Sequence, residues 1–262
     1  MTNALLRVEN VTVRFGGIVA LDNFSLDVRS GLIQALIGPN GAGKSTMLNV
    51  ITGLYAIDRG TVMFDRERID GRSPHTISRM GIARTFQNTE LFGEMSAIEN
   101  VMVGLDRHYS YNLAIGMAHG PGYRRSEIAV RREAQDLLAL VGLADDAAIA
   151  AAALPFGKQR RLEIARALAT RPKLLLLDEP AAGLRAAEVE SLNLILFNLR
   201  AKQGLTILVI DHVMALVMAV SDKISVLNFG RKIAEGEPNT VRRAPEVIRA
   251  YLGEKAAHAL GA

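Results

Sequence analysis

The chain has 262 residues, of which 49% are hydrophobic and 22% are charged, and its formal net charge is +4. These proportions are typical of a globular protein and exclude general disorder. The absence of cysteine excludes disulfides and thiolate metal sites. No apolar run reaches the roughly 18 residues of a membrane-spanning helix. The first residues lack a basic segment followed by an apolar core, so we also expect no signal peptide.

The N-terminal part predicts strands followed by a helix. Apolar and polar residues alternate over residues 6–15 and again over 18–28, which indicates two half-exposed strands. Residues 32–37 are almost all apolar, as in a parallel strand that is buried on both faces. Helical periodicity begins near Lys44 and ends around Gly53.

The middle of the chain differs from its C-terminal part. Helical patterns are found at residues 96–104, 126–141 and 158–170. Buried strands are predicted at residues 173–178, 206–211 and 223–228, with helical stretches between them. Strands that alternate with helices, interrupted by a mostly helical insert, predict an α/β sheet that carries a helical subdomain at about residues 88–158. We expect the tail after Gly253 to be frayed.

A glycine-rich loop stands between a predicted strand and a predicted helix. It comprises Gly38, Pro39, Asn40, Gly41, Ala42, Gly43, Lys44, Ser45 and Thr46 and fits the pattern G-x-x-x-x-G-K-[ST]. Small residues let backbone N–H groups surround phosphates, and the helix N-terminus adds positive potential. Lys44 supplies a cation, and the Ser45 hydroxyl can reach Mg²⁺. A glycine-rich turn with an exposed lysine is the alternative, but the flanking strand and helix favour a nucleoside triphosphate site.

Two carboxylates stand at the C-terminal end of the buried strand predicted at residues 173–178. Asp178 and Glu179 come at the carboxyl end of that strand, where ligands of open α/β sheets bind. We expect Asp178 to hold Mg²⁺ and Glu179 to polarise the attacking water. Adjacent carboxylates repel each other, and a metal ion relieves that repulsion. The alternative is that they cap the next segment.

Three further residues are candidates on weaker grounds. His212 follows another apolar strand and could hydrogen-bond the γ-phosphate, although a lone histidine is more often structural. Gln87 lies where the helical insert begins and can offer its amide oxygen to Mg²⁺ or water. Phe15 ends the first strand and could stack on adenine, with a core phenylalanine as the alternative.

The order of these motifs resembles that of ABC ATPases. The segments Gly38–Thr46, Leu154–Arg161 and Leu174–Pro180 are similar to the Walker A, signature and Walker B motifs of that family. Gln87 and His212 match its Q-loop and switch histidine. The resemblance implies that Lys44, Glu179 and His212 are catalytic and that Ser45, Gln87 and Asp178 are the metal ligands. It adds Phe156, Gly157 and Lys158 of the signature segment to the residues that contact ATP.

The resemblance also implies a fold. It is the P-loop NTPase fold of ABC ATPases, with a RecA-like parallel-sheet core, an antiparallel β subdomain and a helical insert. We expect a single domain over residues 1–262. Its catalytic core would comprise about 1–87 and 159–253, its helical subdomain about 88–158, and its frayed tail 254–262.

A narrower resemblance concerns the transported solute. Segments 154–168, 178–184 and 247–253 look like the Liv-type subgroup, and 90–101 is similar to the larger of its two ATPase subunits. That subgroup energises bacterial uptake of branched-chain amino acids, with relatives that serve other small polar solutes. The resemblance implies ATP and Mg²⁺, two transmembrane permeases, a second ATPase subunit and, indirectly, a periplasmic solute-binding protein. It places the chain peripherally on the cytoplasmic face of the bacterial inner membrane.

The signature segment departs from the family pattern. Pro155 stands where serine is usual, and proline offers neither a hydroxyl nor an N–H. Phe156 and Lys158 replace a glycine and a glutamine. Two interpretations follow: either the signature loop binds the γ-phosphate more weakly, or the charge of Lys158 compensates electrostatically.

Two other classes of function remain as alternatives. A soluble ABC ATPase of nucleic-acid repair or translation usually has two ATPase domains or a long coiled-coil insertion, and this chain has neither. Its basic stretch at residues 123–132 is interleaved with acidic and apolar residues, as on a solvated helix face, so we expect no nucleic-acid partner. A small-molecule kinase would leave the signature-like segment and His212 unexplained.

Overall fold

The computed structural model describes residues 4–85, 90–109 and 121–252, with the side chains of 121–125 and of residue 252 left out. The chain forms two compact units. We call Met1–Arg84 together with Lys173–Ala262 the core unit, and Thr85–Pro172 the helical unit. The helical unit extends beyond the expected 88–158 because the helix at residues 156–169, which carries the signature segment, packs against the helices at 97–105 and 121–140.

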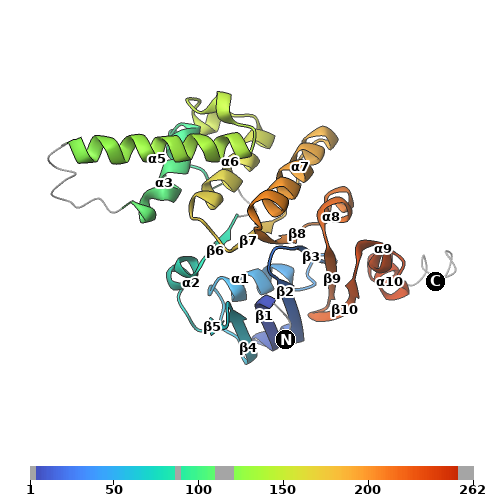
Figure 1. The fold of residues 1–262 in the computed structure, drawn as a ribbon. Helices are drawn as coiled ribbons and strands as arrows, with labels where there is room; N and C mark the ends of the chain where they lie inside the picture. The colour runs from blue at the N-terminus through green and yellow to red at the C-terminus, as the bar shows by residue number, and fades with distance from the viewer. Residues whose placement is uncertain (1–3, 86–89, 110–120, 253–262) are drawn as a thin grey trace. The chain divides into compact units, whose positions relative to one another are not determined.

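A six-stranded sheet forms the centre of the core unit (Figure 1). Its order is β10-β9-β3-β8-β7-β6, and all neighbours are parallel except β10 and β9. The strands are β3 (Ile33–Ile37), β6 (Ile82–Arg84), β7 (Leu174–Asp178), β8 (Thr206–Ile210), β9 (Lys223–Asn228) and β10 (Arg231–Gly236). Every residue of β3, β7 and β8 is buried, which explains their continuous apolar sequences.

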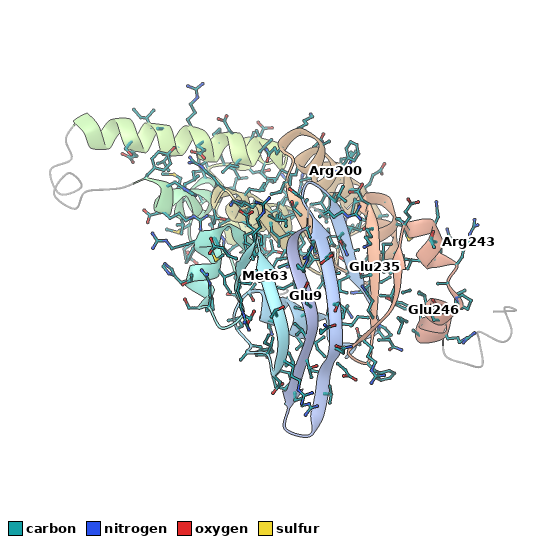
Figure 2. The ribbon with its side chains drawn as sticks, turned by 60° about the horizontal axis from the view of Figure 1, so that its bottom comes forward. Glu9, Met63, Arg200, Glu235, Arg243 and Glu246 are labelled. Atoms are coloured by element: carbon teal, nitrogen blue, oxygen red, sulfur yellow. The ribbon has the colours of Figure 1, made fainter. Side chains whose placement is uncertain are left out.

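A second, antiparallel sheet has the order β2-β1-β4-β5. Its strands are β1 (Ala4–Phe15), β2 (Ile18–Arg29), β4 (Arg59–Phe64) and β5 (Glu67–Arg68). Glu9 and Met63 mark the adjacent strands β1 and β4 (Figure 2). One face is apolar, and its Phe24 and Phe64 join Leu48 and Leu176 in a single hydrophobic cluster. The antiparallel subdomain and the parallel core therefore share one set of buried side chains.

The helices of the core unit cover this framework. They are α1 (Lys44–Ile51), α2 (Pro74–Met80), α7 (Ala186–Gln203), α8 (Met214–Val220), α9 (Pro238–Arg242) and α10 (Pro245–Leu252). Ser73 caps α2 by accepting a hydrogen bond from the Thr76 amide. None of the helices in the described residues has the length and hydropathy that a membrane crossing requires.

The helical unit contains α3 (Ala97–Leu105), α5 (Pro121–Leu140) and α6 (Phe156–Ala169), with short 3₁₀ turns at Asp106–His108, Ala144–Asp146 and Ala151–Ala153. Helix α3 begins with a capping box, in which Ser96 and Glu99 satisfy each other's backbone N–H groups. The fully buried Asn100 amide donates to the carbonyls of Phe92, Met95 and Ser96. Asn100 thereby fixes the segment that leads into α3.

Candidate functional site

The phosphate-binding loop connects β3 to α1, as the sequence pattern predicts. Two of its glycines are held where no side chain fits. A Cβ on Gly38 would lie 2.0 Å from the Leu227 carbonyl oxygen, and one on Gly43 would lie 2.5 Å from the Ala20 carbonyl oxygen. Gly38 and Gly43 also have positive φ values of 156° and 109°. Glycine is therefore required at both positions for conformation and for space.

Lys44 is enclosed by this loop. It is only 7% exposed, and its Nζ donates hydrogen bonds to the carbonyl oxygens of Gly38 at 2.7 Å and Pro39 at 2.9 Å. Burial lowers the pKa of Lys44, while the negative charges of Glu179 and Asp178 act in the opposite direction. The ammonium group is thus held by the loop carbonyls and is attracted by the carboxylates of Asp178 and Glu179 at the end of β7.

Asp178 ends β7 and is 5% exposed. Its Oδ2 accepts a hydrogen bond from Arg84 Nη2 at 2.8 Å, in an ion pair that is almost entirely buried. Arg84 Nη1 also donates to Asn49 Oδ1 on α1 at 2.7 Å. Arg84 therefore links α1 to the carboxylate of β7. No role was predicted for Arg84, because an arginine at the end of a three-residue strand belongs to no recognisable sequence motif.

Glu179 has an unusual backbone. Its φ is +49°, in the left-handed region that few glutamates adopt, and its N–H donates to the Ile210 carbonyl at 2.7 Å. Its Oε1 lies 3.7 Å from Nδ1 of His212, which follows β8. The structure thus brings the predicted general base and the predicted switch histidine together.

Asp211 connects the two segments that carry these residues. Its fully buried carboxylate accepts hydrogen bonds from the amides of Ala181 at 2.9 Å and Val213 at 2.8 Å. The loop after β7 and the loop after β8 are therefore tied to one side chain. The sequence showed Asp211 beside His212 but did not indicate this anchoring role.

Phe15 lies at the end of β1 and is 45% exposed, so it is not a core phenylalanine. Its ring meets that of Tyr55 edge to face, with centroids 5.1 Å apart. The two exposed rings form an aromatic surface on the core unit that could accept a base. Sequence analysis did not single out Tyr55.

The donors around α1 suit Mg²⁺ bound together with phosphate. The exposed Ser45 is the second residue of α1, and Asp178 is the last residue of β7. Within the described part of the chain, no three His, Asp or Glu side chains form a metal site by themselves. Mg²⁺ commonly takes one or two protein oxygens and completes its shell with phosphate and water, so this small donor set fits the ion.

The signature segment lies in the helical unit. Helix α6 begins at Phe156 after Pro155, which offers no side-chain cap. Lys158 Nζ forms an ion pair with Asp146 Oδ1 at 2.7 Å, and the 44% exposed Phe156 ring packs against the Arg160 guanidinium. The charge of Lys158 is therefore already neutralised within the unit. Gln87, another predicted ligand, lies outside the described residues.

The loop, the buried lysine and the paired carboxylates define a P-loop nucleotide-binding protein. The sequence model described as ABC transporter matches residues 21–182, so the chain belongs to the ABC transporter family, as an ATP-binding subunit with the ABC ATPase fold. A second model, described as branched-chain amino acid ATP-binding cassette transporter, matches residues 231–257. The predicted fold class and the predicted ABC ATPase are both confirmed.

Individual relatives agree with this assignment. The chain is 44% identical to the high-affinity branched-chain amino acid transport ATP-binding protein BraF of Pseudomonas aeruginosa, over 97% of this chain and all of BraF. It is 43% identical to the Escherichia coli protein LivG of the same description, with the same coverage. A crystal structure of the ADP conformation of an ATP-binding cassette of an ABC transporter is 34% identical, with a TM-score of 0.83 over 97% of this chain and all of that one.

Proposed function

We propose that the chain is the ATP-hydrolysing subunit that drives import of branched-chain amino acids or a related small polar solute. The observation that carries the solute class is the C-terminal match at residues 231–257, which lies outside the general ABC transporter match. Full-length identity of 43–44% to branched-chain amino acid transport proteins supports the same class.

The chemistry follows from the core unit. Lys44 exchanges its two loop carbonyls for phosphate oxygens of ATP, whose adenine stacks on Phe15. Glu179 accepts a proton from the attacking water as the water oxygen bonds to the γ-phosphorus and the bond to ADP breaks. His212, 3.7 Å from Glu179, hydrogen-bonds the γ-phosphate and keeps it in line with that water.

Magnesium is the expected cofactor. Ser45, Asp178 and Gln87 would hold it, and the ion supplies charge neutralisation at the phosphates. Asp178 already has a cationic partner in Arg84, so its carboxylate is oriented before any metal binds. Arg84 thereby acts as a positioning residue for the metal ligand.

The remaining nucleotide contacts belong to the helical unit. In our proposal, the N-terminus of α6, with Phe156, Gly157 and Lys158, contacts the ATP held by the partner ATPase. Both α1 and α6 begin without a side-chain cap, which leaves backbone N–H groups for an anion. ATP supports the closed pair because it makes contacts there that ADP cannot make.

Membrane partners complete the proposal. Two permeases, a second ATPase subunit and a periplasmic solute-binding protein form the transporter, with this chain on the cytoplasmic face of the inner membrane. The exposed Phe92 and Met95, which precede α3, offer an apolar surface for a permease. Glu90 to Met95 is our proposed part of that contact.

Affinity purification from gently solubilised membranes tests this assembly. A tag on the chain should recover two polytopic permeases and a related ATPase, identified by mass spectrometry. The purified complex, reconstituted in liposomes, should then accumulate leucine and not urea. Accumulation should require ATP on the side of the membrane where this subunit lies. Recovery from the soluble fraction with nucleic acid would support a repair or translation ATPase instead. Accumulation of urea alone would assign the related small polar solute in place of branched-chain amino acids, and accumulation of neither would overturn the solute class.

A further inference from the structure

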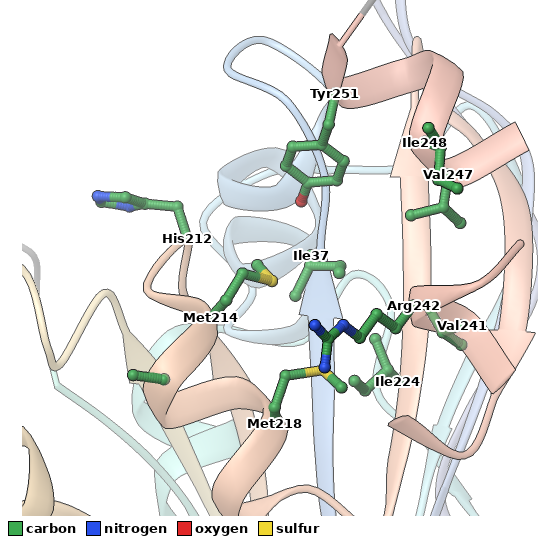
Figure 3. A pocket seen from close by; sticks show the side chains of 11 residues that line it. Ile37, His212, Met214, Met218, Ile224, Val241, Arg242, Val247, Ile248 and Tyr251 are labelled. Carbon is green, nitrogen blue, oxygen red and sulfur yellow. The ribbon is translucent and has the colours of Figure 1, made fainter. Parts of the chain in front are cut away.

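A cavity of about 700 Å³ lies in the core unit beside the phosphate-binding loop (Figure 3). It is open to solvent on one side and is lined by residues of α8, α9, α10, β3 and β9. The volume is within the range of roughly 300–1,000 Å³ that is usual for small-molecule sites. Of its lining residues, only His212 has a role in the chemistry proposed above.

The walls of the cavity are almost entirely apolar. Eight of its eleven described lining residues are apolar, and these include Met214, Met218, Ile224, Val247 and Ile248. Methionine side chains adapt to ligands of different shape, which suits a site for flexible aliphatic chains. None of the lining residues that the structure describes has a carboxylate side chain.

One cation enters this apolar space. The guanidinium of Arg242, the last residue of α9, points toward Met214 and Met218 in Figure 3. No carboxylate of the described residues forms an ion pair with Arg242. The imidazole of His212 points away from the other lining side chains in the same view. The only charge directed into the cavity by the described lining residues is therefore positive.

We propose that this cavity binds a small aliphatic carboxylate, with its chain between the methionines and its carboxylate on Arg242. Charge complementarity selects the carboxylate, because a guanidinium gives two parallel hydrogen bonds to one. The apolar walls select the aliphatic body. An alkylammonium of the same length would bring a second cation to Arg242 and is excluded.

The cavity also contacts the phosphate-binding loop. Tyr251 of α10 lines it, and a backbone hydrogen bond joins its hydroxyl to Gly38. Burial raises the pKa of Tyr251 to about 12, so the hydroxyl stays neutral at physiological pH. Ile37, the residue before Gly38, is another wall. A ligand in the cavity therefore touches residues that position the first glycine of the loop, and its effect on ATP affinity rests on the proposed nucleotide site.

Methionine-methyl NMR of the full nucleotide-free chain tests the site directly. The chain has nine methionines, of which Met214 and Met218 report on the cavity and Met63 in β4 serves as the distant control. Octanoate should shift the signals of Met214 and Met218 and leave that of Met63 unchanged. Octylamine and octanol, at equal chain length, should bind at least tenfold more weakly. Equal shifts with all three compounds, or none with octanoate, would overturn the proposal.

Two neighbouring arginines provide a matched pair of variants. Arg242→Gln should weaken octanoate binding by roughly 10–100-fold, the usual range for a charged hydrogen bond. Arg242 and Arg243 are both exposed, but only Arg242 lines the cavity. Arg243→Gln, at the position labelled in Figure 2, should therefore leave binding unchanged. Equal losses in both variants would overturn the assignment of Arg242.

A chain ended after Leu252 distinguishes a small ligand from the C-terminal segment itself. Octanoate binding within threefold of the full chain supports the proposal. Binding that appears only after truncation would show that residues 253–262 occupy the cavity and would overturn it.

Coupling to the loop is measured with a non-hydrolysable ATP analogue. Saturating octanoate should change its affinity at least threefold, and Tyr251→Phe should reduce that change. No change in affinity would overturn the coupling. Octanoate binding is measured without nucleotide, so a failure of the transport assignment would not alter the first result.

Discussion

The core unit and the helical unit differ in the surroundings of the lysine that each is proposed to bring to the nucleotide. Lys44 in the core unit is 7% exposed and is held by loop carbonyls beside Asp178 and Glu179. The Lys158 side chain in the helical unit is 36% exposed and is paired with Asp146. A buried charge without its partners is costly, whereas a pair in which one partner reaches solvent, as Lys158 does beside the buried Asp146, is less so. The structure therefore predicts stringent chemistry at the core unit and tolerance at the signature segment.

The largest expected effect is on hydrolysis. Glu179→Gln should lower kcat by roughly 10²–10⁴, the usual contribution of a positioned general base, while ATP still binds. Phosphate release and nucleotide affinity, measured on the same preparation, separate a loss of hydrolysis from a loss of ATP binding. Glu190→Gln, on the exposed face of α7, is the matched control. Unchanged turnover would remove Glu179 from the catalytic role.

Nucleotide binding should depend on the enclosed lysine. Lys44→Ala should weaken ATP binding by roughly 100-fold or more, because the phosphates lose a desolvated charge partner. Equilibrium dialysis or calorimetry gives the affinity, and Lys202→Ala on the surface of α7 serves as the control. Near-normal affinity in Lys44→Ala would contradict the proposed role of the loop.

The buried ion pair between Arg84 and Asp178 should dominate the stability of the site. Arg84→Met leaves the carboxylate without its cation and should lower the free energy of unfolding by roughly 3–5 kcal/mol. Urea denaturation measures the loss. The exposed Arg79→Met in α2 should change stability by less than about 0.5 kcal/mol. Equal stability of the two variants would show that the pair is dispensable.

The helical unit should respond weakly to loss of its own pair. Asp146→Asn releases Lys158 near the N-terminus of α6 and should change the KM for ATP of the assembled transporter by only about 2–5-fold. The neighbouring exposed Asp145→Asn should leave KM unchanged. A loss of tenfold or more would mean that this pair organises the signature segment more strictly than its exposure suggests.

The smallest effect concerns Glu133 of α5. A hydrogen bond from Arg171, together with one from Tyr109, holds the pKa of Glu133 below its usual value. A lowered pKa stabilises the fold above the unfolded pKa, and that contribution is lost as pH falls through the folded pKa. Glu133→Gln should therefore cost less than about 1 kcal/mol at pH 7 and nothing in acid.

Denaturation at several pH values checks this prediction for Glu133. Glu127→Gln, an exposed position on the same helix, should show no such pH dependence. A difference between wild type and Glu133→Gln that persists in acid would assign the effect to packing instead of charge.

Prediction from sequence succeeded where the pattern is local. The buried strands β3, β7 and β8 are continuous apolar runs, and the loop before α1 has a fixed motif. It did not predict β4 or the three-residue β6, which pair with the distant strands β1 and β7. The predicted catalytic, nucleotide-binding and metal-binding roles of all the site residues, including Gln87 and the signature residues, stay predictions.

The sequence by itself determined the class of chemistry, because phosphate cradles require glycines, a lysine and a hydroxyl at fixed spacing along one loop. Only the tertiary structure showed that Arg84 neutralises Asp178, that Asp211 ties two loops together and that Asp146 engages Lys158. It alone revealed the cavity with Arg242 and Tyr251. These features join residues far apart in the chain, and electrostatic pairing and burial depend on distance in space, which spacing along the sequence does not record.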